Sequence, residues 1–280
     1  MNKTITTIIL TFNEELNIEK AIESISDISD RIIVVDSFST DSTVNLAKSL
    51  GVEVYQNKFL NQASQINYAL ENLDIDSDWI LRLDADERIS KGASEEILEI
   101  IQKNDNDING IVVPFEVTFL GKKLKHGGIF PFKKMIVVKR GFAKIENRHM
   151  DEHFYLLSGK SIEISNLSNH LDYKDLTNWI DKHNKYSSRE VLDYFSSSSE
   201  LSNDVNLNPS AKLKRFVKFN IYYKFPMGMR SKLYYIYRYY FKLGFLDGTE
   251  GKIFAVLQAY WYRFLVDAKI YEKENKERKK

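Results

Sequence analysis

The stretch DWILRLDADER, residues 78–88, joins an apolar segment to a pair of carboxylates. Its first half is short and rich in branched and aromatic side chains, which predicts a buried β-strand. Asp84 and Asp86 follow two positions apart, and in an extended chain this spacing points both side chains to the same side. The pair therefore predicts a site for one cation, or for one set of polar atoms, at the end of the strand.

The same strand signal recurs upstream, where it alternates with helix signals. The strand-like segments are residues 4–10, 31–36, 52–56 and 78–83. The helix-like segments between them are residues 14–25, 41–51 and 61–73. This alternation predicts an α/β fold in which helices cover a mostly parallel central sheet. In such sheets ligands bind beyond the carboxyl ends of the strands.

Length and composition indicate a folded globular protein. The chain has 280 residues, of which 43% are hydrophobic and 28% are charged, enough to bury a substantial core. It has no cysteine, which excludes disulfides and thiolate chemistry and fits a reducing compartment. The start lacks the pattern of a signal peptide, and the apolar run at residues 253–266 is shorter than the roughly 20 residues of a membrane span. We therefore expect a cytoplasmic protein without a transmembrane helix.

Three polar clusters follow three of the predicted strands. They are TFNEE at 11–15, DSFSTD at 36–41 and DADE at 84–87. Each has a structural explanation taken singly, because Thr11 with Glu14 fits a capping box, Asp41 can cap a helix, and Asp84 can simply end a strand.

Capping does not explain why Asp36, Asp84 and Asp86 gather at one edge, where like charges repel by about 4 kcal/mol per close pair. Bound Mg²⁺ or Mn²⁺ would relieve this repulsion and would share its coordination with phosphate oxygens, because Mg²⁺ keeps few protein ligands. The predicted ligand is a metal-bound nucleotide or diphosphate. The chain has neither G-x-G-x-x-G nor G-x-x-x-x-G-K-[ST], which disfavours dinucleotide and P-loop sites.

These motifs, at these separations, resemble glycosyltransferase family 2, whose members have the GT-A fold. The resemblance is strongest over residues 4–90, in TIILTFNEELNI, IIVVDSFSTDST and DWILRLDADE. Further on, GGIFP, MDEHF and WIDKHNKYSSRE resemble a subgroup that includes lipopolysaccharide-core and capsule glucosyltransferases. The stretch from Gly244 to Glu272 resembles the C-terminal signature of many bacterial members.

The resemblance implies roles for the residues at the strand ends. The residues implied in nucleotide-sugar binding are Thr11, Asn13, Glu14, Asp36, Arg82 and Asp84. Asp36 is implied at the uracil or ribose, and Asp84 at the ribose and the metal. Asp86, together with Asp84, would then bind Mn²⁺ or Mg²⁺ across the diphosphate of a UDP-sugar.

One position departs from the subgroup. A basic residue is common in the helix after the third strand, where this chain has Ile66. Contacts to the diphosphate must then come from elsewhere, with Arg82, His126 and Lys133 as candidates.

Inverting transfer needs a base that deprotonates the acceptor hydroxyl. The resemblance places a carboxylate base in RHMDEHF, where Glu152 is the first candidate and Asp151 the second. A surface turn of charged residues is the structural alternative for this stretch. His153 could add a metal ligand, although an isolated histidine beside a phenylalanine is more often packed or hydrogen-bonded.

Charge is unevenly distributed along the chain. Residues 1–110 hold 9 Lys or Arg against 21 Asp or Glu, and the rest of the chain holds 31 against 18. Residues 211–246 hold nine Lys or Arg and no Asp or Glu, interleaved with Tyr and Phe. This pattern suits an anionic bilayer surface. Packing into a subdomain or a homo-oligomer contact is the second interpretation, and single-stranded nucleic acid is the third.

We therefore expect a GT-A domain over residues 1–195, a polar linker over 196–210, and a helical region over 211–280 that lies on a membrane or in an oligomer contact. The implied function is metal-dependent, inverting transfer of a hexose from a UDP-sugar to a lipid-linked or polysaccharide acceptor. This would serve lipopolysaccharide or capsule synthesis at the inner face of the cell membrane, without a nucleic-acid partner. One alternative is a catalytically weak scaffold protein that binds nucleotide sugar at the membrane, supported by Ile66. Another is a nucleotidyltransferase, whose glycine-rich phosphate loop is missing.

Overall fold

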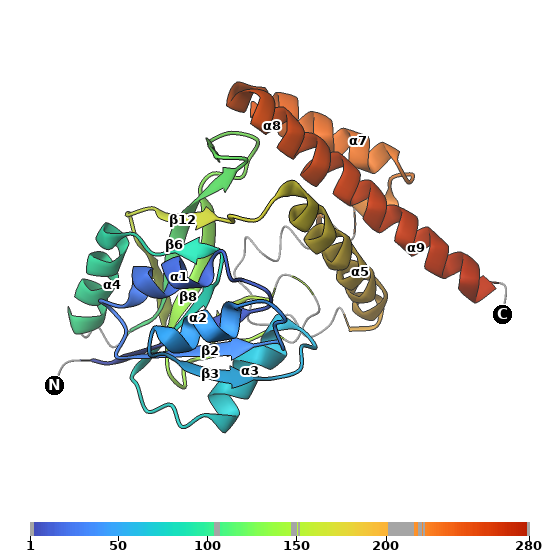
Figure 1. Ribbon diagram of the computed structural model, residues 1–280. Helices are drawn as coiled ribbons and strands as arrows, with labels where there is room; N and C mark the ends of the chain where they lie inside the picture. Colours follow the sequence, from blue (N-terminus) through green and yellow to red (C-terminus); the bar gives the residue numbers. More distant parts are fainter. Residues whose placement is uncertain are drawn as a thin grey trace. The chain divides into compact units, whose positions relative to one another are not determined.

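The computed structural model describes residues 3–103, 107–146, 150, 152–200, 216–217, 220 and 222–278. The chain folds into two compact units whose segments alternate along the sequence (Figure 1). The first unit comprises Met1–Thr118 and Pro131–Tyr173, and the second comprises Phe119–Phe130 and Lys174–Lys280. The chain therefore enters the second unit, returns to the first, and then completes the second.

A mixed β-sheet forms the centre of the first unit. Its strands there are β1 (Ile5–Thr11), β2 (Arg31–Asp36), β3 (Glu53–Gln56), β4 (Trp79–Asp84), β5 (Glu87–Arg88), β6 (Ile108–Phe119), β8 (Phe132–Lys139), β11 (Lys160–Glu163) and β12 (Ser168–Leu171). The order across the sheet is β3-β2-β1-β4-β8-β6-β12-β5, and β11 pairs with β6. β1 runs parallel to β2 and β4, whereas β8 is antiparallel to β4 and β6. A separate small sheet pairs β9 (Ala143–Ile145) with β10 (Phe154–Leu156). The expected α/β fold is confirmed.

Helices pack on both faces of this sheet. They are α1 (Ile18–Ile25), α2 (Thr43–Ser49), α3 (Gln62–Asn72) and α4 (Lys91–Lys103). Side chains of β1 alternate between the faces, so that Ile5 and Ile9 join a core with α1 and α4, and Ile8 joins a second core with α3. Ile66 of α3 is fully buried in the second core. The helix position at which the subgroup has a basic residue therefore faces apolar side chains.

A capping box fixes the start of α3. Asn61 Oδ1 accepts the Ser64 N–H at 2.7 Å, and Ser64 Oγ accepts the Asn61 N–H at 3.2 Å. Asn61→Ala is expected to lower the free energy of unfolding, measured by urea denaturation, by about 1 kcal/mol, because the N-terminal N–H groups of the helix lose their acceptor. Asn72→Ala at the other end of α3 is the matched control. Equal losses in the two variants would contradict a specific capping role.

Helices form the second unit, which confirms the expected helical C-terminal region. They are α5 (Leu176–Glu200), η1 (Tyr222–Lys224), α7 (Met229–Ile236), η2 (Tyr237–Phe241), η3 (Gly244–Asp247), α8 (Gly248–Phe254), η4 (Ala255–Trp261) and α9 (Tyr262–Arg278). α8, η4 and α9 follow one another without a break, and Figure 1 shows them as one long helix. The inserted segment 119–130 contributes β7 (Lys122–Leu124). No helix within the described ranges combines the length and apolar character that crossing a bilayer requires.

The structure groups α5 with the second unit, whereas the sequence-based boundary after residue 195 assigned it to the first. The physical reason is an apolar and aromatic stripe on α5, in which Val191 packs with Tyr262 of α9. Residues 196–200, expected to begin the linker, are the end of α5. Residues 201–210 lie outside the described part of the chain.

Buried ion pairs use some of the basic side chains of the C-terminal region. Arg230 Nε donates to Asp267 Oδ1 at 2.7 Å, and both residues are buried. Arg263 Nη1 donates to Glu190 Oε1 at 2.7 Å. Part of the basic and aromatic composition of this region therefore serves packing within the second unit.

Candidate active site

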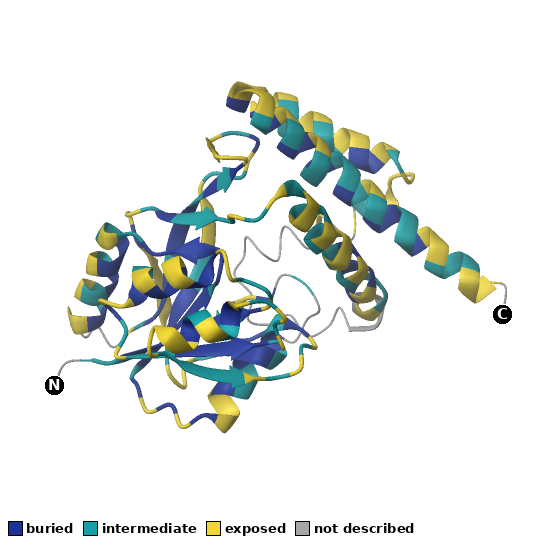
Figure 2. Ribbon diagram, in the orientation of Figure 1, coloured by how far each residue is buried: buried dark blue, intermediate teal, exposed yellow. Residues whose placement is uncertain are grey.

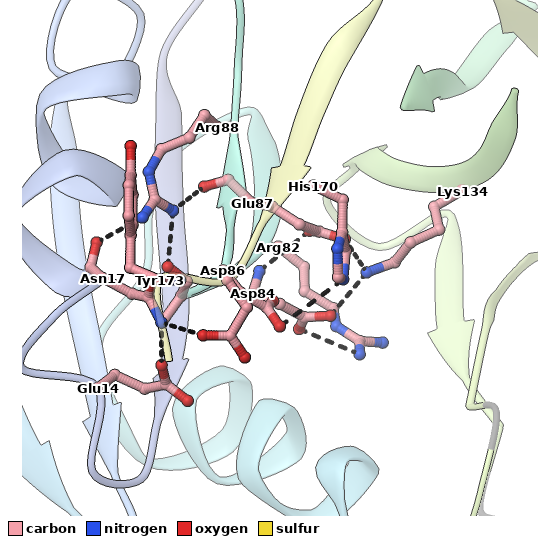
Figure 3. Close-up of polar contacts among 12 residues, drawn as sticks. Glu14, Asn17, Arg82, Asp84, Asp86, Glu87, Arg88, Lys134, His170 and Tyr173 are labelled. Carbon is pink, nitrogen blue, oxygen red and sulfur yellow. Dashed lines mark hydrogen bonds and ion pairs between the residues drawn. The ribbon is translucent and has the colours of Figure 1, made fainter. Parts of the chain in front are cut away.

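The candidate site lies at the edge of the sheet where β1, β2 and β4 end. The strand register aligns Thr11 with Asp36 and Leu10 with Asp84. Because the three strands are parallel, their C-terminal side chains meet at this edge. Figure 3 shows the part of the site around Asp84 and Asp86. The strand ends that the sequence singled out are thus neighbours in the fold.

Asp36 is buried, and its carboxylate organises the loops that follow β1 and β2. It accepts hydrogen bonds from Thr11 Oγ1 at 3.1 Å, Ser39 N at 2.9 Å and Gln56 Nε2 at 3.1 Å. Ser39 Oγ donates to it as well. A carboxylate with four such donors is held in one orientation. Asp36 therefore sets the shape of the rim on this side of the site.

Asn13 joins the two loops. It adopts a left-handed backbone conformation with φ 55°, which asparagine tolerates better than most residues. Its N–H donates to Ser39 Oγ at 2.8 Å, and its Oδ1 accepts the Thr40 N–H at 2.8 Å. The Glu14 N–H donates to Thr43 Oγ1 at 2.7 Å. These reciprocal bonds make the rim a single hydrogen-bonded structure.

The capping explanation is wrong for Thr11 and Glu14. The helix that follows them, α1, has Asn17 as its N-cap, and Glu14 Oε2 accepts a hydrogen bond from Asn17 Nδ2 at 2.8 Å. Asp41 does bind the start of α2, because its Oδ1 accepts the Thr43 N–H at 3.0 Å, but the N-cap residue of α2 is Ser42.

A largely buried lysine binds Asp84 at the end of β4 and Glu87 of β5 (Figure 3). Lys134 Nζ, from β8, lies 2.7 Å from Asp84 Oδ2 and 2.6 Å from Glu87 Oε1. Arg82 Nη2 lies 3.5 Å from Asp84 Oδ1. The Lys134 side chain is 11% exposed and that of Glu87 is 1% exposed. Cations of the protein therefore relieve part of the repulsion that the sequence argument assigned to a bound metal.

Burial and charge move the pKa values of these two carboxyl groups in opposite directions. Burial raises the pKa of Asp84, but the positive charges of Lys134 and Arg82 outweigh burial and lower that pKa to about 2. At Glu87 burial dominates and raises the pKa. Burial lowers the pKa of Lys134, but the charges of Asp84 and Glu87 outweigh it and raise that pKa. Asp84 therefore stays ionised at neutral pH beside a charged ammonium group.

Asp84→Asn is expected to lower the free energy of unfolding by about 2 kcal/mol at neutral pH. A carboxyl group with a lowered folded-state pKa stabilises the fold above its unfolded pKa of about 3.9. This stabilisation is lost as the pH falls toward the folded-state pKa of about 2. Urea denaturation at a series of pH values should therefore show that the difference in free energy of unfolding between variant and wild type becomes smaller as the pH falls. Glu71→Gln, at an exposed carboxylate of α3, is the control, and a gap independent of pH would refute the assignment.

Asp86 and His170 form a second polar pair. Antiparallel pairing of β12 with β5 sets His170 opposite Glu87, and His170 Nε2 lies 3.6 Å from Asp86 Oδ2. Carboxylate oxygen and imidazole nitrogen are both ligands that divalent metals such as Mn²⁺ accept. Across the described residues, no three His, Asp or Glu side chains are grouped so as to hold a metal by themselves. Asp86 and His170 thus form a polar pair that the described side chains around it do not extend to a complete metal site.

Glu152 lies next to this cluster, where it also supports α3. Its Oε1 accepts the N–H of Gln62, the first residue of α3, at 3.1 Å, and its backbone oxygen accepts Arg82 Nη1 at 3.1 Å. Arg82 Nη2 in turn donates to Gln62 Oε1 at 2.6 Å. Glu152 is buried, whereas the neighbouring His153 is exposed. Asp151, the second candidate base, lies outside the described residues.

All three cations suggested for the diphosphate have partners within the protein, and those of Arg82 are Glu152, Gln62 and Asp84. Lys133 Nζ lies 2.7 Å from Glu163 Oε1, because neighbouring residues of a strand face opposite sides and it is Lys134 that faces Asp84. His126 belongs to the second unit, where its Nδ1 lies 2.8 Å from Asp247 Oδ1.

A polar cluster that the sequence did not predict lies beside Asp84 and Asp86 (Figure 3). The buried Asn17 donates from Nδ2 to Glu14 Oε2 at 2.8 Å and to Asp172 Oδ1 at 2.9 Å, and its Oδ1 accepts the Tyr173 N–H at 3.1 Å. Arg88 Nη2 donates to the Asn17 backbone oxygen at 2.8 Å. Arg88 directly follows DADE and was the available signal, whereas nothing local links Asn17 to Asp172.

Comparison with known proteins gives consistent matches. The family model described as Glycosyl transferase family 2 matches residues 6–158, more than half of the chain. An uncharacterized glycosyltransferase of Rickettsia typhi is 27% identical over 99% of this chain and 89% of that protein. The lipopolysaccharide core biosynthesis glycosyltransferase LpsC of Rhizobium meliloti is 27% identical over 95% of this chain and 91% of that protein. A crystal structure of glucosyl-3-phosphoglycerate synthase from Mycobacterium tuberculosis aligns at 22% identity and a TM-score of 0.35, over 41% of this chain and 44% of that chain.

Proposed function

Because the chain belongs to glycosyl transferase family 2, we propose that it transfers a hexose, with inversion, from a UDP-sugar to a lipid-linked or polysaccharide acceptor. One observation carries the proposal: Asp84 ends β4 level with the ends of β1 and β2, and Asp86 follows beside His170. The likeness to a lipopolysaccharide core biosynthesis glycosyltransferase supports the acceptor class. In this proposal the product belongs to a bacterial surface glycan, lipopolysaccharide or capsule, made at the cytoplasmic face of the membrane.

The rim formed by the loops after β1 and β2 receives the nucleotide in this proposal. Thr11, Asn13 and Glu14 line its pocket, and Asp36 contacts the uracil or ribose. Asp36 already accepts hydrogen bonds from Thr11, Ser39 and Gln56. A hydrogen-bond donor of the nucleotide would therefore add to these three bonds or replace one of them. The hydrogen bonds between the loops keep the rim in shape before the donor arrives, which lowers the entropic cost of binding.

Asp86 and His170, with Asp84, would hold Mn²⁺ or Mg²⁺. A divalent metal at this place supplies positive charge to the diphosphate that departs from the sugar. Lys134 keeps Asp84 ionised and oriented, and Arg82 adds a second buried positive charge.

Glu152 is our first candidate for the base and Asp151 the second. The base takes the proton from the acceptor hydroxyl while the acceptor oxygen bonds to the anomeric carbon and the bond to the diphosphate breaks. Glu152 lies close to Arg82 and, through it, to Asp84. Its carboxylate also accepts the Gln62 N–H. The Glu152 side chain would therefore act as the base and also stabilise the start of α3.

Calorimetric titration of a panel of UDP-sugars, with and without Mn²⁺, tests this function together with an assay for UDP release. We expect one donor to bind in a Mn²⁺-dependent manner and to release UDP when an acceptor is present. Failure of every UDP-sugar to bind in the presence of Mn²⁺ would overturn the proposal. Binding without release of UDP would favour the scaffold alternative. That alternative has Ile66 as its only support, and the buried Arg82 and the largely buried Lys134 supply positive charge that α3 lacks.

A further inference from the structure

The second unit carries an exposed apolar face on α7, η2 and the turn that follows. We propose that this face, called here the α7–η2 face, binds the surface of an anionic lipid bilayer. Its exposed apolar members are Met229, Leu233, Ile236, Tyr237, Tyr240, Phe241, Leu243, Phe245 and Leu246. Phe241 is 75% exposed, Tyr240 55% and Leu246 53%. Exposed residues run along α7 in Figure 2. Exposed apolar side chains concentrated in one segment of the fold are typical of an interaction site with a protein or a membrane.

Helical spacing places these side chains together. Met229, Leu233, Ile236 and Tyr240 recur every three or four residues, which aligns them on one side of a helix. The flank of α7 that carries the buried Arg230 and Ser231 packs inside the second unit, where Arg230 binds Asp267. Along α7 and η2, apolar side chains therefore face solvent beside the exposed Lys232.

The charges of this region select the partner. Residues 222–246 contain no Asp or Glu. Lys224, Lys232 and Lys242 are exposed there, and within the part of the chain that the structure describes none of them takes part in a salt bridge. The next acidic residues along the chain are already engaged, because Asp247 accepts from His126 N at 2.9 Å and Glu250 lies 3.3 Å from the Lys122 ammonium. Cations beside apolar and aromatic side chains match an anionic headgroup layer above acyl chains.

The turn after η2 is held rigidly, so its apolar side chains are presented in a fixed arrangement. The Lys242 oxygen accepts the Gly127 N–H at 2.7 Å, and Arg238 Nε donates to the Gly127 oxygen. Leu243 adopts φ 58°, and a Cβ on Gly244 would lie 3.0 Å from the Arg238 oxygen. Binding to a flat surface therefore costs little ordering of the backbone.

A second copy of the chain fits this face less well than a lipid surface does. In a two-fold symmetric dimer the patch would meet itself, so Lys232 and Lys242 would approach their own copies with no carboxylate of residues 222–246 to pair with. An anionic bilayer has the opposite charge and also accepts the apolar side chains.

Flotation of the full chain with vesicles tests the inference without donor or acceptor, so its outcome is independent of the proposed function. We expect binding to vesicles that contain phosphatidylglycerol, much weaker binding to pure phosphatidylcholine, and loss of binding at high salt. Phe241→Ser is expected to weaken binding at least roughly tenfold through lost insertion. Lys242→Glu is expected to weaken it roughly tenfold through reversed charge.

Two substitutions outside the face are the matched controls. Tyr271→Ser changes a side chain of α9 that is 55% exposed, and Lys48→Glu changes an exposed lysine of α2. Both should bind vesicles like the wild type. Equal binding by Phe241→Ser and Tyr271→Ser, or binding independent of phosphatidylglycerol, would overturn the inference. Two other results would also overturn the inference. Concentration-dependent dimerisation that Phe241→Ser abolishes would assign the face to a second copy of the chain. Binding of poly-dT without binding of vesicles would assign it to single-stranded nucleic acid.

Discussion

Asp86→Asn is expected to lower the rate of Mn²⁺-dependent UDP release by roughly 10²- to 10³-fold. Asparagine has nearly the size of aspartate, so the buried position keeps its packing, but the negative charge that would face the metal beside His170 is lost. The apparent affinity for Mn²⁺ should fall together with the rate. Initial rates with the donor selected from the panel, measured across a Mn²⁺ titration, give both quantities.

Asp76→Asn in the exposed loop before β4 is the matched control and should keep the wild-type rate. His170→Gln is expected to shift the Mn²⁺ dependence in the same direction as Asp86→Asn, since it removes the other donor of the pair. An Asp86→Asn protein with the wild-type rate and Mn²⁺ dependence would exclude Asp86 as a metal ligand.

Glu152→Gln is expected to lower the rate of transfer by roughly 10²- to 10⁴-fold and to leave donor binding unchanged. Glutamine keeps a side-chain oxygen that can accept the Gln62 N–H, so the contact with the start of α3 survives while the proton acceptor is removed. Single-turnover kinetics report the chemical step, and calorimetry with the same donor reports binding.

Asp151→Asn distinguishes the two candidate bases. If Glu152 is the base, Asp151→Asn should change the rate far less than Glu152→Gln does. The reverse result would move the role to Asp151 and leave Glu152 as support for Arg82 and α3. Glu163→Gln, at a half-exposed glutamate of β11, controls for the loss of a carboxylate without a place in the site.

The residues that local sequence could identify are those that follow a strand directly. Asp36 and Asp84 end buried parallel strands, and parallel strands bring their C-terminal ends to one edge. The edge of the sheet and its acidic character were therefore predictable. The hydrogen bonds that Asp36 accepts were not, because they depend on how two loops close over one another.

The remaining site residues depend on pairings between distant strands. Lys134 reaches Asp84 because β8 inserts antiparallel beside β4, and His170 reaches Asp86 because β12 pairs with β5. Neither pairing follows from the β-α-β alternation of the first hundred residues. The sequence suggested Lys133 and not Lys134 for the same reason. A shift of one residue along a strand moves the side chain to the other face of the sheet.

The start of the helical unit could not be predicted either, because it too depends on contacts between distant segments. The polar run that begins near residue 196 suggested a linker, and yet α5 continues to Glu200 and packs on α9. A helix surface that is polar on one side and apolar on the other gives no sign in the sequence of which unit it will cover.

The alternation of chain segments between the two units has a consequence for biosynthesis. Residues 119–130 leave the ribosome long before the helices with which they pack. Phe119 can meet Phe254, at 5.1 Å between ring centroids, only after more than a hundred further residues have been made. The first unit is complete in the nascent chain once Tyr173 has emerged, whereas the insert must wait with its apolar side chains uncovered. Vectorial synthesis thus supplies all residues of the first unit before those that complete the second.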